Sequence, residues 1–134
     1  MRPKTIVSFE ILSLAAVALG LLVTWLTWDG IVAQARSAVL GSGIEAAVAI
    51  LVLVYVAILV LLILLASRRA SNVARWLLAL IVAVELVFTL PAIGATLAAG
   101  TVGLISTLQL AMMTVAVVLL FLPPSRLWFR GAEA

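Results

Sequence analysis

Residues Ile44–Ala66 read IEAAVAILVLVYVAILVLLILLA, and no charged residue lies between Ala46 and Ala66. A helix needs about 20 predominantly apolar residues to cross the hydrocarbon core of a bilayer. This stretch is long enough and presents almost no polar group to water. It therefore predicts a transmembrane helix and decides the fold class of the whole chain.

Three further runs have the same character: Ile6–Trp28, Trp76–Thr96 and Val102–Leu122. The 134-residue chain is 67% hydrophobic and 10% charged, whereas a soluble domain has about 25% charged residues. A chain this apolar has too little polar surface to face water. We therefore predict an all-α membrane protein, with a single transmembrane domain over residues 1–134 that forms a bundle of four transmembrane helices.

The composition excludes several kinds of chemistry. The chain has neither cysteine nor histidine, which removes disulfides, thiolate chemistry, the commonest general base and the commonest metal ligand. The few carboxylates are spread over different segments. We therefore expect no enzyme activity, no metal and no cofactor. The net charge of +3 does not indicate nucleic acid, because the basic residues flank the apolar runs.

The basic residues are distributed unevenly between the two sides of the predicted bundle. Only Arg36 lies on one side, and seven of the eight lie on the other: Arg2, Lys4, Arg68, Arg69, Arg75, Arg126 and Arg130. Loops rich in Lys and Arg stay in the cytoplasm, so we predict a multi-pass protein of the bacterial inner membrane with both termini cytoplasmic. The first run exceeds the usual length of a signal-peptide core, which favours a retained span.

Aromatic and basic residues also mark where the spans meet the membrane surfaces. Trp25 and Trp28 fall at the predicted outer interface, and Trp76 and Phe129 fall at the inner one, where amphipathic rings prefer to lie. Basic side chains near that surface attract anionic lipid headgroups. The predicted headgroup anchors are Arg68, Arg69, Arg75, Arg126, Arg130 and Trp128.

Local signals predict how the spans begin and end. The segment SGIE at residues 42–45 is a capping-box pattern, which makes Glu45 a cap of the second span. The two prolines at residues 123–124 end the fourth span, because proline has no backbone N–H to donate. Apolar residues from Ile31 to Leu40 recur at helical spacing, so the first loop is expected to form a short helix on the outer membrane surface.

One face of the first span has small and hydroxyl side chains, which let helix backbones approach closely in a membrane. This predicted helix-packing face consists of Ser13, Ala16, Gly20 and Thr24. Glu10 lies near the cytoplasmic end of the same span, and we expect it to be an interfacial carboxylate paired with a basic residue.

Glu85 lies near the middle of the third apolar run. A carboxyl at that depth costs about 2.5–3.5 kcal/mol or more, and such residues face protein or water. The four apolar runs contain no Lys or Arg, so no basic partner is available inside the membrane. We predict that Glu85 is neutral at pH 7 unless water reaches it, because a low-dielectric environment disfavours the charged form.

Residues on two other spans match Glu85 in depth when counted from the span centres. Tyr55 is at the centre of the second span, and it is the expected hydrogen-bond partner of Glu85. On the fourth span, either Thr114 or Gln109 is expected to complete a central polar cluster.

A polar stripe leads from Glu85 toward the outer surface. Thr89, Ala92 and Thr96 share a helical face with Glu85. Pro91 removes one helical hydrogen bond, so it is expected to kink the third span just beyond Glu85.

Two functions from different classes fit these residues. A carboxyl that is neutral when dry and charged when wet suits proton or cation coupling. Glu85 then predicts a small transporter or channel, with Tyr55, Thr89, Gln109 and Thr114 as further site candidates and a homo-oligomer to enclose a pathway. Alternatively, Glu85 only ties helices together, and the chain is a non-catalytic accessory or scaffold subunit of a larger membrane complex.

Two interface segments, SRRASNVARW at residues 67–76 and PSRLWFR at residues 124–130, resemble those of a family of small, uncharacterised four-span bacterial inner-membrane proteins. This resemblance implies the same four-span topology but does not imply any particular activity. The chain is also similar to small multidrug-resistance transporters, which have four short spans and one embedded Glu. Theirs lies in the first span, however, and the charge bias seen here departs from their dual-topology members.

Overall fold

Four long helical spans make up the body of the protein. The computed structural model describes residues 1–39 and 42–131, and every regular element among them is helical. All four spans are long and apolar enough to cross a membrane, which indicates a multi-pass membrane protein. In chain order they are α1 (Lys4–Leu26), α3 (Ile44–Arg69), α4 with its continuation (Asn72–Thr89 and on to Ala98), and α6 (Thr101–Phe121).

The third span begins four residues earlier than its apolar run. Ser71 precedes α4, and its side-chain oxygen accepts a hydrogen bond from the backbone N–H of Ala74 at 3.3 Å. Such a cap satisfies one of the unpaired donors at a helix start. The connection from α3 is therefore a tight turn at Ala70 and Ser71, with Ala70 in the left-handed region at φ 50°.

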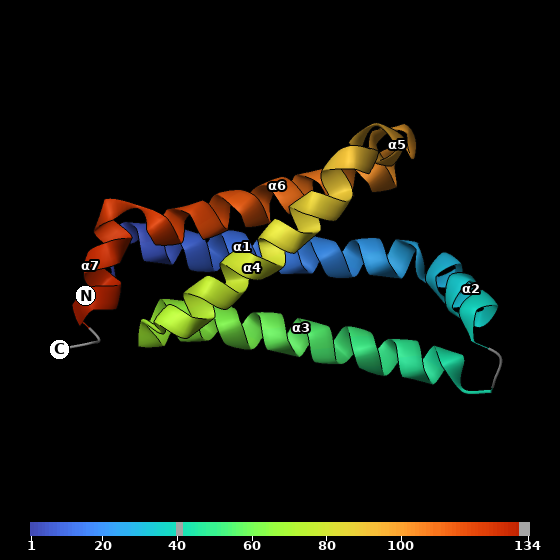
Figure 1. Cartoon of the computed structure of the whole chain (residues 1–134), viewed down its shortest axis with the longest axis horizontal. Helices are drawn as coiled ribbons and strands as arrows, with labels where there is room; N and C mark the ends of the chain where they lie inside the picture. Colours follow the sequence, from blue (N-terminus) through green and yellow to red (C-terminus); the bar gives the residue numbers. More distant parts are fainter. Residues whose placement is uncertain (40–41, 132–134) are drawn as a thin grey trace.

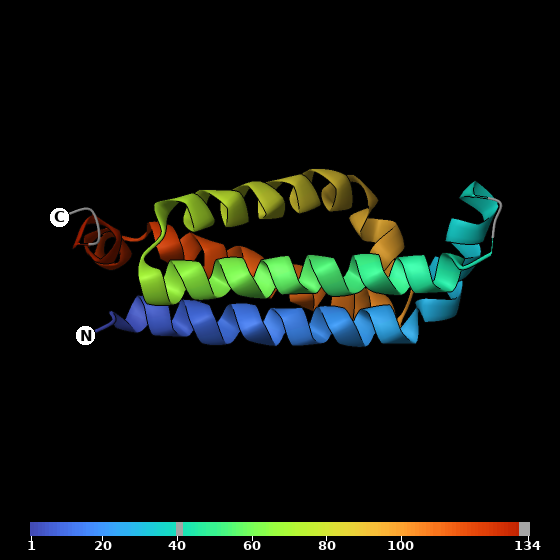
Figure 2. The same cartoon turned by 90° about the horizontal axis from the view of Figure 1, so that it is seen from below.

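The four spans pack in a ring, in the order α1, α3, α4 and α6 (Figures 1 and 2). Helix α1 packs against α3 and α6, and α4 packs against the same two helices. In Figure 1, α4 crosses the molecule diagonally, from beside α3 at one end to beside α6 at the other. Both termini and the α3–α4 turn lie at one end of the molecule, which we call the basic end.

The apolar core is concentrated in the half of the bundle nearest the basic end. There the helices close on large side chains, which exclude both water and lipid. The largest apolar side chains that are fully buried are Ile6, Phe9, Ile63, Leu78, Leu120 and Phe129.

Helix α2 (Trp28–Ala38) occupies the first loop, and its presence confirms the short helix predicted there. It lies at the end of the molecule opposite the basic end (Figure 1). Val32 is buried, and it anchors the helix to the bundle. Leu40, which the predicted helix included, lies outside the described residues.

The capping box predicted before the second span is wrong. Gly43, with φ 86°, is the residue next to α3, and no side chain caps the helix. Ser42 therefore lies one residue too early for its oxygen to reach the first turn. The Glu45 carboxylate instead forms an ion pair with Arg36 of α2, because that guanidinium offers a stronger partner than a backbone N–H.

The predicted interruption at Pro91 is confirmed. Helix α4 gives way to the short 3-10 turn η1 (Leu90–Ala92), which contains the proline, before α5 (Ile93–Ala98) begins. In Figure 2, the chain bends at this point, and α5 turns toward α6. The connection to α6 is short, and it passes through Gly100 at φ 75°.

Helix α7 (Pro123–Gly131) follows α6 directly and runs across the basic end of the bundle (Figures 1 and 2). The fourth span ends at Phe121, and Leu122 is extended before the two prolines, as predicted from their missing N–H groups. Ser125 and Phe129 are buried. The Ser125 hydroxyl hydrogen-bonds with Leu119 O at 2.6 Å and Thr5 Oγ1 at 2.9 Å, which fixes α7 to both α6 and α1.

Candidate functional site

Glu85 and Tyr55 meet between α4 and α3. The Tyr55 hydroxyl donates a hydrogen bond to Glu85 Oε1 at 2.7 Å. This contact confirms the partner predicted from depth, since the two residues are 30 positions apart in the chain. The bond joins two spans, and it gives the embedded carboxyl one polar neighbour.

A cavity of about 250 Å³ lies at the centre of the ring, lined by residues of all four spans. Most of its wall is apolar, from residues such as Val17, Leu78 and Met113. Its polar groups gather in the part of the bundle away from the basic end, and they are Thr24, Tyr55, Glu85 and Gln109. The carboxyl group of Glu85 is therefore beside open space and not in dry packing.

Gln109 enters this cavity from α6. A Cβ placed on Gly20 of α1 would lie 3.3 Å from Gln109 Nε2, so the missing side chain of Gly20 makes room for the amide. Gly20 belongs to the predicted packing face of α1. On the same face Ser13 and Ala16 are fully buried, and Thr24 lines the cavity, with its hydroxyl bonded to Gly20 O.

A second hollow of about 370 Å³ lies between the third span and α6. It is more polar than the central cavity, because Thr89, Thr96 and Ser106 line it together with Glu85 and Gln109. Glu85 and Gln109 thus line both hollows. The structure brings together most of the predicted stripe, although Ala92 in η1 does not line either hollow.

Of the two residues predicted on the fourth span, Gln109 lines the cavity beside Glu85, and Thr114 does not. The Thr114 hydroxyl donates to Leu110 O of its own helix at 2.8 Å, and Thr114 lines neither hollow. Five positions along a helix turn a side chain by about 140°, so the two residues cannot face the same space. Ser106 was missed by the sequence analysis, although its spacing of three from Gln109 places both on one helical face.

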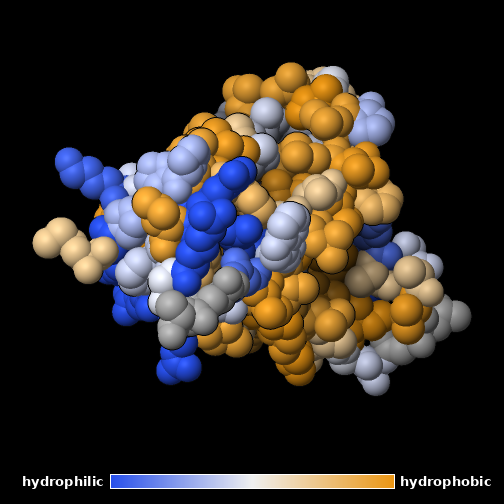
Figure 3. Space-filling model, turned by 60° about the vertical axis from the view of Figure 1, so that its left-hand side comes forward, coloured by the Kyte–Doolittle hydropathy of each residue, from blue (hydrophilic) through white to orange (hydrophobic). Residues whose placement is uncertain are grey.

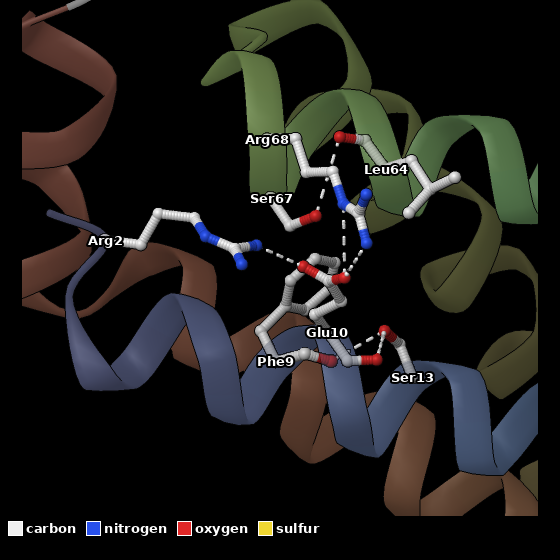
Figure 4. Close-up of polar contacts among 7 residues, drawn as sticks. All are labelled: Arg2, Phe9, Glu10, Ser13, Leu64, Ser67 and Arg68. Atoms are coloured by element: carbon white, nitrogen blue, oxygen red, sulfur yellow. Dashed lines mark hydrogen bonds and ion pairs between the residues drawn. The ribbon is translucent and has the colours of Figure 1, made fainter.

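A polar cluster at the basic end joins α1 to α3 (Figure 4). Glu10, whose side chain is 12% exposed, forms ion pairs with Arg2 Nη1 at 2.5 Å and with Arg68 Nη2 at 2.9 Å. Arg68 Nε also donates to Glu10 at 3.3 Å. The basic partner predicted for Glu10 is confirmed, and the cluster lies over the closely packed half of the bundle.

Arg75 is held among aromatic rings at the same end. Its guanidinium carbon lies 4.6 Å from the ring centre of Phe121, 4.9 Å from that of Phe129 and 5.6 Å from that of Trp76. Such cation–π contacts stabilise a cation against ring faces. Arg75 therefore ties α4 to α6 and α7 within the protein.

No group of three or more acidic residues that could hold a metal ion occurs among residues 1–39 and 42–131. Comparison of the chain with protein-family models, with curated proteins and with solved structures finds no match. The chemistry of the site therefore follows from its own geometry: the Glu85 carboxyl and the Gln109 amide line both hollows, and the Tyr55 phenol lines the central cavity.

Proposed function

We propose that this protein is a small membrane transporter or channel in which Glu85 binds a proton or a small cation. The observation that supports this proposal best is that Glu85 lines both the central cavity and the polar hollow beside it. A carboxyl at such a position can bind a proton from one side and release it to the other. Gln109, which also lines both spaces, supplies a neutral acceptor next to it.

The distribution of packing supports a one-sided route to this site. Large buried side chains and the Glu10 cluster close the basic end, whereas Thr89, Thr96 and Ser106 line a polar hollow toward the other end. We further propose that the basic end faces the cytoplasm of a bacterial cell, as the positive-inside rule implies. Access to Glu85 is then from the outer side.

The substitution Glu85→Gln tests the proposal. Purified protein is reconstituted into liposomes that contain a pH-sensitive dye, and proton entry is followed after a potential is imposed. We expect flux with the native chain and a loss of at least about tenfold with Glu85→Gln, because the amide cannot bind and release a proton. Glu45→Gln is the matched control, since Glu45 is an exposed carboxylate at the opposite end from the core.

Two results would contradict the proposal. One is a Glu85→Gln variant with the same flux as the native protein. The other is a native protein that conducts neither protons nor Na⁺ or K⁺ above the level of empty liposomes. Elution of both variants at the native volume in mild detergent would show that folding is not the cause of any loss.

The alternative function, an accessory or scaffold subunit, is favoured by the Tyr55–Glu85 hydrogen bond, which would suffice to join α3 to α4. In that case Tyr55→Phe lowers stability by about 0.5–1.5 kcal/mol. Glu85→Gln has little effect on stability or on function, because the amide oxygen still accepts the bond. Copurification separates the two classes: a homo-oligomer favours transport, and a stoichiometric larger partner favours the accessory role.

A further inference from the structure

Helix α7 has a position suited to the surface of a membrane. It runs across the basic end of the bundle, whereas the spans run along the bundle (Figures 1 and 2). One face of α7 is buried through Ser125 and Phe129, while Leu127 is 70% exposed. A short helix that crosses the ends of the spans is suited to lie along a bilayer surface.

Basic and apolar surfaces meet at this end of the molecule. Figure 3 shows hydrophilic side chains gathered there, directly beside an extended hydrophobic surface. On α7 the two basic residues are Arg126 and Arg130, one helical turn apart. Their guanidinium groups therefore project from neighbouring positions on one side of the helix.

A surface hollow of about 520 Å³ lies against this side of α7, lined by Pro123, Pro124, Arg126, Leu127 and Arg130. Its walls are apolar apart from the two guanidinium groups. Arg126 Nε donates to Phe121 O at 3.1 Å, which holds that side chain at the end of α6. The hollow is thus lined by the Arg126 guanidinium group, which is held by a hydrogen bond, by the Arg130 guanidinium group, and by apolar side chains.

Two of the other arginines predicted to bind headgroups, Arg68 and Arg75, have partners inside the protein. Arg68 is bonded to Glu10, and Arg75 lies among the rings of Trp76, Phe121 and Phe129. Among the predicted anchors, Arg126 and Arg130 are the pair that shares a hollow.

We propose that this hollow binds one anionic phospholipid. The lipid phosphate lies between the guanidinium groups of Arg126 and Arg130, and the upper part of an acyl chain lies against Leu127 and the two prolines. Arginine suits this role because its planar group can donate two parallel hydrogen bonds to phosphate. The apolar floor favours a lipid over a soluble phosphate, which has no group to place there. This inference is independent of any role of Glu85.

The test counts bound lipid on the intact protein. The full chain, purified in a neutral detergent, is titrated with dioleoylphosphatidylglycerol or dioleoylphosphatidylcholine, and adducts are measured by native mass spectrometry. We expect saturable binding of one phosphatidylglycerol and weaker binding of phosphatidylcholine. The double variant R126Q/R130Q should bind phosphatidylglycerol at least about tenfold more weakly, since each basic residue near a bilayer surface contributes to this attraction.

Two controls keep the result specific. Arg130→Gln alone leaves the Arg126–Phe121 hydrogen bond in place, so it should fold normally and still lose several-fold in affinity. Arg36→Gln removes one charge at the opposite end and should leave binding unchanged. The proposal is overturned if R126Q/R130Q binds phosphatidylglycerol like the native chain, if both lipids bind equally, or if millimolar inorganic phosphate displaces the lipid.

Discussion

Glu10 and Glu85 both project from membrane-spanning helices, but different groups surround them. Glu10 is near the end of its span, where Arg2 and Arg68 reach it from the surface. Glu85 is too deep for any basic side chain, and its neighbours are a phenol, an amide and hydroxyl groups. The Glu10 carboxylate and its two cations hold parts of the chain together, whereas the Glu85 carboxyl has only uncharged polar groups around it.

Two carboxyl-to-amide substitutions should differ in their effects on stability. Glu10→Gln removes the charge from a pair of ion contacts around a side chain that is 12% exposed. We expect a loss of about 1.5–3 kcal/mol, the range for hydrogen bonds to charged groups. Glu45→Gln breaks a pair whose side chains are about 60% exposed, and it should cost about 0–1 kcal/mol. Unfolding in mixed micelles with increasing SDS measures the loss of stability in each variant. Equal losses would show that the burial of the carboxylate does not decide how much its ion pairs contribute.

At the scale of elements, the third span shows how one proline shapes a site. Pro91 ends α4 and produces η1, after which α5 turns toward α6. This turn brings Thr96 of α5 and Ser106 of α6 to the same hollow as Glu85. The approach is close: a Cβ on Gly103 would lie 1.7 Å from Thr96 O, so only glycine fits at that position of α6.

Gly103→Ala should therefore destabilise the protein, and Gly94→Ala should not. The methyl group at residue 103 would force α5 and α6 apart, at a cost of about 1–3 kcal/mol for overpacking. Gly94 lies in α5 with nothing within 4 Å of the added atom, and alanine there favours the helix by up to about 1 kcal/mol. Thermal unfolding in detergent compares the two variants. A Gly103→Ala protein as stable as the native one would refute the close approach.

At the scale of the whole molecule, the bundle is asymmetric along its length. The basic end is closely packed and carries the termini, the α3–α4 turn and α7. The cavity lies between the two ends, and the opposite half contains the polar hollow and α2. This asymmetry of packing coincides with the asymmetry of charge, since Arg36 is the one basic residue of the sequence outside the basic segments.

The two ends should lie on opposite sides of the membrane. Because the chain contains no cysteine, single cysteines can be introduced without background. A membrane-impermeant maleimide added to intact cells should label Ser37→Cys in α2, and it should label Arg69→Cys at the α3–α4 turn only after the cells are opened. Labelling of Arg69→Cys in intact cells would reverse the orientation that the basic residues imply.

The sequence predicted the contact between Tyr55 and Glu85, because each polar group deep in an apolar span needs a partner at its own depth. It also predicted the kink at Pro91 and the end of the fourth span at residues 123–124, because proline has no backbone N–H to donate. It could not choose between Gln109 and Thr114, since counting along a span gives depth but not rotation. The capping box failed because Gly43, and not Ser42, is the residue next to α3, and Glu45 pairs with Arg36 of another helix.

The sequence by itself determined the number of spans, their approximate positions in the chain and the concentration of basic residues at one end. These features depend on how each residue partitions between water and hydrocarbon. They do not depend on which residues are in contact in the folded protein. The tertiary structure alone decided which helix faces meet, where the cavity lies, and which basic side chains pair within the protein. Lipid and side chains are equally apolar, so the rotation and crossing of helices are set by the fit of small residues such as Gly20 and Gly103 against their neighbours.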